Sequence, residues 1–64
     1  MQKTIKNGYG EKIHIKIVGE ETLIHHEDAM DDFKSLEWVL ENIILSKEEI
    51  EDIKDTIDEL KNMN

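Results

Sequence analysis

The side chains best suited to chemistry in this sequence are three histidines, His14, His25 and His26. His25 and His26 are adjacent, so in an extended strand their rings point to opposite faces. If a strand over residues 21–26 pairs with one over residues 11–18, His14 lies opposite His25 on one face of the sheet. The sequence therefore predicts one cross-strand pair of imidazoles.

Two imidazoles at that spacing are the beginning of a zinc or nickel site, with Glu27 or a second subunit supplying further ligands. A set of two histidines and one carboxylate on an exposed sheet face matches no recognised ligand spacing. His14 and His25 are thus weak metal candidates. We expect a solvated pair of rings, with no metal and no other cofactor.

Signatures of the common catalytic sites are missing from the sequence. It contains no cysteine and no G-x-S-x-G nucleophile motif. The segment 8–10 (Gly-Tyr-Gly) lacks the later glycine and the helix start of a dinucleotide fingerprint. Acidic pairs such as Asp31-Asp32 are frequent, but acid–base catalysis needs a carboxylate with a perturbed pKa in a pocket. We therefore expect no enzyme activity.

Charge divides the chain into unequal halves. Residues 1–26 carry four Lys against three Glu, whereas residues 27–64 carry four Lys against thirteen Asp and Glu. The formal net charge is −8, and arginine is absent. Phosphate groups and anionic lipid surfaces repel such a chain. We therefore expect a protein partner, most simply a basic one, with no direct binding to nucleic acid or membrane.

The chain of 64 residues predicts one small domain spanning 1–64. A domain of this size buries only about 60% of the surface that its unfolded form exposes. Disulfides are excluded because cysteine is absent, so self-association is the remaining common support. We expect a homodimer or a higher oligomer. The lack of cysteine and of any long apolar run leads us to expect a cytoplasmic location.

The apolar pattern changes near residue 26 and predicts an α+β fold. Before it, apolar and polar residues alternate, which is typical of strands. After it, apolar residues recur every three or four positions, which is typical of helices. We expect a three-stranded antiparallel β-meander followed by two α-helices packed on one sheet face; the strands are about 2–7, 11–18 and 21–26 and the helices about 28–44 and 47–62.

The expected turns fix the register of the strands. A three-residue loop over 8–10 brings Ile5 opposite Ile13, whereas a two-residue turn would bring Thr4 into that place. A type II′ turn at Gly19-Glu20 completes the second hairpin. We prefer the three-residue loop because it puts the isoleucines on one face.

The junction of the two expected helices lies near Ser46. Acidic residues from Asp28 onward suit the first turn of the first helix. Ser46 and Glu49 form an S-x-x-E capping box for the second helix. One continuous, bent helix is the alternative, and the short junction leaves it open.

Trp38 stands apart from the expected apolar stripe of the first helix. Trp38 and Leu45 are spaced i, i+7 on a face that otherwise carries polar residues, among them Asp31 and Glu41. Tryptophan is enriched among binding hot spots, so this face is a candidate interface. The alternative is that the second helix covers Trp38 and makes it core. With the exposed acids of the second helix, the candidate partner-binding set is Trp38, Leu45, Glu41, Asp31, Asp52, Asp55 and Glu59.

The second helix carries a narrow apolar seam at 3-4-3 spacing. Such a seam packs either on the same chain or on the same helix of another subunit, and we assign it to an oligomer contact with the first possibility open. Its residues are Ile50, Ile53, Ile57 and Leu60.

Together these features predict a small acidic, non-catalytic protein-binding module, a regulator or inhibitor of a basic protein, of bacterial or phage type. One alternative is a nucleic-acid mimic that inhibits a DNA- or RNA-binding protein. Another is a metal-binding protein that uses its histidines, or a structural subunit that only assembles with itself.

Overall fold

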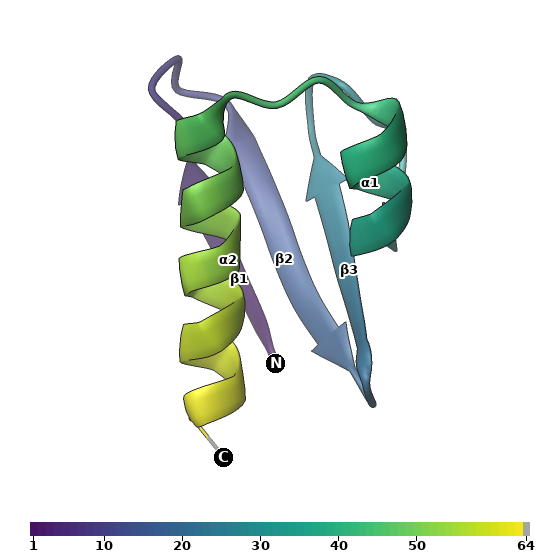
Figure 1. The fold of residues 1–64 in the computed structure, drawn as a ribbon, viewed down its shortest axis with the longest axis vertical. Coiled ribbons are helices and arrows are strands. Elements are labelled where there is room, and N and C mark those ends of the chain that lie inside the picture. Colours follow the sequence, from purple (N-terminus) through teal and green to yellow (C-terminus); the bar gives the residue numbers. More distant parts are fainter. Residues whose placement is uncertain (64) are drawn as a thin grey trace.

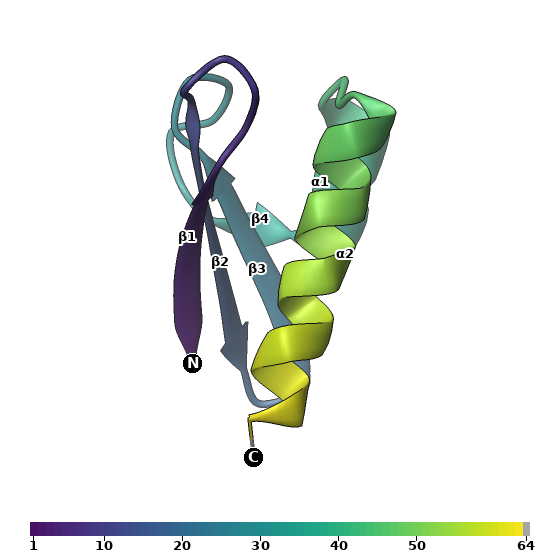
Figure 2. The same ribbon diagram turned by 90° about the vertical axis from the view of Figure 1, so that its left-hand side faces the viewer.

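Residues 1–63, which the computed structural model describes, form two layers. An antiparallel sheet in the order β1-β2-β3-β4 makes one layer, and both helices lie on the same face of it (Figure 1, Figure 2). The elements in chain order are β1 (Gln2–Lys6), β2 (Lys12–Val18), β3 (Glu21–His26), β4 (Lys34–Ser35), α1 (Leu36–Asn42) and α2 (Lys47–Asn62). The predicted α+β class is confirmed, with four strands instead of three.

The predicted register of the first three strands is confirmed. Ile5 lies opposite Ile13, and His14 lies opposite His25. Because side chains alternate along a strand, this register gathers the isoleucines on the helix side of the sheet. Ile15 is completely buried there.

Both hairpin turns depend on a glycine with positive φ. In the first, the Asn7 N–H donates to the Glu11 carbonyl over 3.0 Å, and Gly10 closes the loop at φ 79°. In the second, Gly19 has φ 61°, whereas Glu20 after it has a negative φ. That combination matches a type II′ turn, as predicted.

The first predicted helix, 28–44, is wrong over its first half. Residues 27–33 form a loop instead, followed by a short strand in which Lys34 pairs with Ile24. Met30 from this loop is buried in the core, while Phe33 contacts the rings on the opposite face of the sheet. A helix would turn both side chains to one side and leave the edge of β3 unpaired.

Serine side chains begin both helices. The Ser35 hydroxyl accepts from the Trp38 N–H at the start of α1. At the start of α2, Ser46 and Glu49 exchange two bonds of 3.2 Å each, which is the predicted capping box. Between the helices Ile43 is extended, so two separate helices replace the bent-helix alternative. Neither helix of the described chain is long and apolar enough to cross a membrane.

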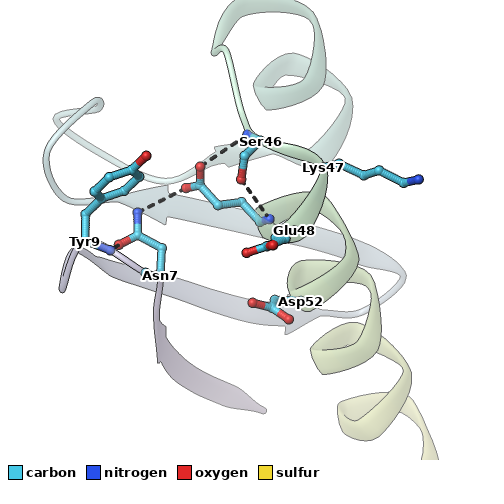
Figure 3. A pocket seen from close by; sticks show the side chains of 8 residues that line it. Asn7, Tyr9, Ser46, Lys47, Glu48 and Asp52 are labelled. Atoms are coloured by element: carbon cyan, nitrogen blue, oxygen red, sulfur yellow. Dashed lines mark hydrogen bonds between the residues drawn. The ribbon is translucent and has the colours of Figure 1, made fainter.

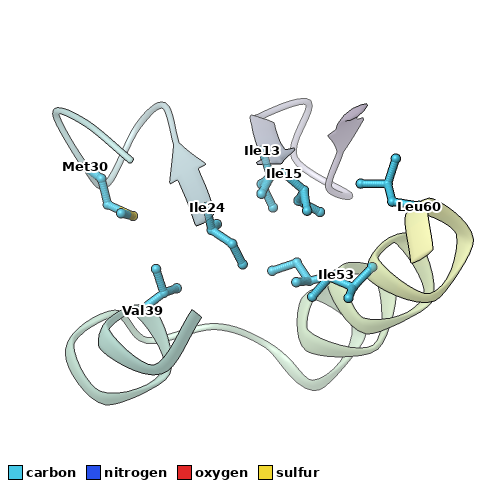
Figure 4. Close-up of a cluster of buried hydrophobic side chains, with 8 residues drawn as sticks. Ile13, Ile15, Ile24, Met30, Val39, Ile53 and Leu60 are labelled. Atoms are coloured by element: carbon cyan, nitrogen blue, oxygen red, sulfur yellow. The ribbon is translucent and has the colours of Figure 1, made fainter. Parts of the chain in front are cut away.

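Side chains from both layers and from the loop before β4 make one core (Figure 4). Five of them are almost wholly buried, and burying an aliphatic side chain of this size contributes about 1.5–3 kcal/mol. The buried apolar residues are Ile13, Ile15, Ile24, Met30, Val39, Ile53, Ile57 and Leu60.

The apolar seam of α2 belongs to this core. Ile53, Ile57 and Leu60 are 2%, 6% and 3% exposed within the single chain, and Ile50 is half-buried. The assignment of this seam to an oligomer contact is therefore wrong, because the chain's own sheet already covers it.

Candidate functional site

The short helix α1 exposes a large part of its apolar surface. Val39 faces the sheet and is fully buried, with Leu36 partly buried beside it. Trp38 and Leu40 remain 38% and 44% exposed, and Ile44 just after the helix is 101% exposed. We call Trp38, Leu40 and Ile44 the α1 patch. A helix of seven residues cannot bury all the apolar side chains that its sequence carries.

Charged groups lie beside the α1 patch. Glu37 and Glu41 are exposed on the same helix. The Lys34 ammonium lies 5.5 Å from the centre of the Trp38 ring, a cation–π arrangement that covers one side of the indole. The Asn42 amide donates to the Trp38 carbonyl over 2.9 Å and closes the end of the helix.

The predicted partner-binding residues do not form one face. Trp38 and Glu41 lie on α1 as expected, but Asp31 lies in the loop before β4 and Leu45 follows the end of the helix. Leu45 is half-buried against the core, so its i, i+7 relation to Trp38 is lost. The alternative in which the second helix covers Trp38 is also wrong, because α2 packs on β1 and β2 (Figure 1).

The remaining members of the set, Asp52, Asp55 and Glu59, are exposed on α2. Glu59 forms an ion pair with Lys3 of β1. Both side chains are about half exposed, so this pair contributes no more than about 1 kcal/mol. The pair ties the end of α2 to the sheet and removes one carboxylate from the acidic surface.

A hollow of about 570 Å³ separates the first hairpin loop from the start of α2 (Figure 3). Asn7 and Tyr9 line one side, and Ser46 and Glu48 line the other. Glu49 crosses between the two walls: it accepts from the Asn7 amide over 3.2 Å and from the Ser46 N–H. Burial by itself raises the pKa of Glu49, yet these hydrogen bonds hold that pKa below its usual value.

His26 is the buried histidine of the chain, at 6% exposure. Its Nε2 lies 3.5 Å from Glu49 Oε2 and 3.9 Å from Glu11 Oε1, while its Nδ1 has no hydrogen-bond partner among the described residues. These distances far exceed metal–ligand bonds of about 2.0–2.2 Å. Within residues 1–63, no group of three His, Asp or Glu side chains is placed to hold a metal ion.

The predicted histidine pair lies on the face of the sheet away from the helices. The rings of His14 and His25 stack with their centroids 5.6 Å apart. His14 bonds to Thr4 Oγ1 and to Glu27 Oε2, each over 2.9 Å, and His25 Nε2 bonds to the Met30 carbonyl. Stacked rings with three of four nitrogens already hydrogen-bonded do not converge on a shared metal ion.

Thr4, His14 and Glu27 form a hydrogen-bonded row that the sequence did not reveal. A hydroxyl, an imidazole and a carboxylate in this order are the groups that activate a nucleophile. The hydrogen bond from His14 also lowers the pKa of Glu27. Catalysis needs, in addition, donors for the developing negative charge and exclusion of water. Thr4 is exposed on the edge strand, so the row holds the His14 ring in place on an open surface.

No protein-family model matches this chain, and no curated protein or solved structure matches it either. The function is therefore argued from the surfaces described above.

Proposed function

We propose that this chain is a small, non-catalytic protein-binding module that docks through the α1 patch onto a basic surface of another protein. The observation that carries the proposal is a clustering of exposed apolar residues. Seven large apolar side chains of the described chain are exposed, and three of them, Trp38, Leu40 and Ile44, lie within seven consecutive residues. Contiguous exposed apolar surface of this kind is a common mark of an interaction site.

Charge supports a basic partner. Residues 36–64, which include both helices, carry nine Asp and Glu against three Lys. Exposed carboxylates such as Glu37 and Glu41 beside an apolar anchor give a negative rim around a desolvated centre. The rim speeds encounter with a basic surface, and the apolar centre then holds the complex.

The test is affinity capture with matched variants. Ile44→Ser removes a fully exposed side chain of the α1 patch, and Tyr9→Ser removes another exposed apolar side chain, 86% exposed, from the distant hairpin loop. We expect a partner retained by the wild type and by Tyr9→Ser to be lost with Ile44→Ser. Equal retention by all three proteins would contradict the proposal.

Salt separates an apolar anchor from binding by charge alone. A nucleic-acid mimic would lose its partner steeply as salt rises above about 0.1 M, because exposed charges are screened within about 10 Å. Lysines interrupt the acidic surface of α2, with Lys54 one turn from both Glu51 and Asp58. This interruption favours the anchored module, whose binding survives moderate salt.

A regulatory or inhibitory role in the cytoplasm of a bacterium or in a phage fits such a module and belongs to the proposal. A homodimer also belongs to it, now without the α2 seam. The mass of the protein in solution at several concentrations tests the homodimer directly.

A further inference from the structure

The face of the sheet away from the helices is an open surface with its own composition (Figure 2). We call it the outer sheet face. Even-numbered residues of β1 and β2 and odd-numbered residues of β3 contribute to it, because the odd isoleucines of β2 point to the helices. Its principal members are Thr4, Lys6, Lys12, His14, Lys16, Val18, Leu23 and His25.

Positive charge gathers on the outer sheet face although the chain as a whole carries −8. Lys6 and Lys12 are directly paired across β1 and β2, and Lys16 lies further along β2. The helices on the other side of the sheet carry most of the carboxylates. Salt screens charge beyond about 8 Å, so a group approaching this face senses its lysines more strongly than the carboxylates behind the sheet.

An apolar centre accompanies the lysines. Phe33 lies over the face, with its ring centre 5.5 Å from that of His25 and 4.3 Å from the Lys16 ammonium. Leu23 is half-buried opposite Lys16, and Val18 at the end of β2 is 56% exposed. A cationic rim around apolar side chains is complementary to a segment that alternates acidic and apolar residues.

We propose that the outer sheet face binds an acidic, partly apolar segment of a second protein. The lysines pair with its carboxylates, and its apolar side chains cover Phe33, Leu23 and Val18. This site lies on the layer opposite the α1 patch and goes beyond the proposed function. A chain with both sites bridges a basic surface and an acidic segment.

The two histidines make this binding depend on pH. An imidazole that takes up a proton adds positive charge to the face, and histidine ordinarily titrates near pH ~6.5. His14 faces Thr4 and Glu27 and lies between the lysines of its own strand, and His25 faces His14, Phe33 and the Met30 carbonyl. Glutamates of the bound segment stay ionised well below that pH, so acidification tightens the complex.

The experiment uses the full chain and a fluorescent peptide of alternating Glu and Val as the probe. The variant Lys6→Ser/Lys12→Ser/Lys16→Ser removes the cationic rim. Its matched control, Lys47→Ser/Lys54→Ser/Lys61→Ser, makes the same change in net charge on α2. We expect the rim variant to weaken binding about tenfold or more, which corresponds to about 1.4 kcal/mol, and the control to change it less than about threefold.

Further arms separate this inference from its rivals. Replacing Val by Ser in the peptide weakens binding if the apolar centre is used, and lowering the pH from about 7.5 to about 5.5 strengthens it unless His14 and His25 are both glutamine. Equal weakening by the two lysine variants overturns the proposal, as does tighter binding of single-stranded DNA than of the peptide. Ile44→Ser leaves peptide binding unchanged, so failure of the α1 site is recognised separately.

Discussion

The side-chain amide of Asn7 donates to the carboxylate of Glu49 over 3.2 Å, and this bond ties the first hairpin to the first turn of α2. The same carboxylate completes the helix cap through the Ser46 N–H. Glu49→Ala removes both contacts, so we expect the free energy of unfolding to fall by about 1–2 kcal/mol. Urea unfolding measures this loss. Glu48→Ala, an exposed neighbour, should change stability by less than about 0.5 kcal/mol, and equal effects would show that the clasp is not used.

The same carboxylate gives a pH dependence with a definite sign. The pKa of Glu49 is lower in the folded chain than its ordinary value of 4.5. Its stabilising contribution is therefore complete above pH 4.5 and is lost as the pH falls through the lower folded pKa. The difference in unfolding free energy between the wild type and Glu49→Gln should be largest near neutral pH and shrink in that acidic range. A difference that grows on acidification would contradict the assignment.

The packing of the core is tested by one substitution at two isoleucines. Ile24 is fully buried, whereas Ile44 is fully exposed. We expect Ile24→Ala to cost about 2–5 kcal/mol, enough to unfold much of a domain this small, because it leaves a cavity between the layers. Ile44→Ala should leave the melting temperature almost unchanged. Thermal unfolding followed by circular dichroism distinguishes the two, and similar losses would mean that the α1 patch is covered in solution.

The histidine pair should ignore metal ions. Stacked rings with bonds to Thr4, Glu27 and the Met30 carbonyl leave no convergent set of ligands. We expect zinc or nickel, with and without a chelator, to change neither the melting temperature nor the mass in solution. A rise in melting temperature that His14→Gln abolishes would show that the rings reorganise around a metal.

The strands were predictable because their signals are local. Alternation of isoleucines fixes which face is buried, and Gly10 and Gly19 allow the positive φ that each turn needs. The same holds for the second helix, since a capping box is read directly from Ser46 and Glu49.

The segment after β3 was not predictable in this way. Met30 and Phe33 are spaced as on one helix face, yet they lie on opposite faces of the sheet because the chain turns to pair Lys34 with Ile24. Pairing of a two-residue strand depends on an open edge of the sheet, which is a tertiary property. One local signal was present: Ser35, followed by an acidic residue, marks the true start of α1.

The candidate sites depend on the same error. Once α1 is shortened, Asp31 and Leu45 leave the face of Trp38, while Leu40 and Ile44 become exposed. The alternation in β3 does place His25 outward and His26 inward, as adjacency implies. The contacts of His26 with Glu11 and Glu49 need the hairpin loop and the helix start to meet, and no spacing in the sequence encodes that meeting.

The most direct measurement of the central claim uses Trp38, the single tryptophan of the chain. Its indole is 38% exposed in the free protein, so its fluorescence reports whether the α1 patch is covered. On addition of a captured partner that lacks tryptophan, we expect the emission to shift to shorter wavelength and acrylamide quenching to fall. A partner that binds without changing either signal would contradict the assignment of the α1 patch as the binding site.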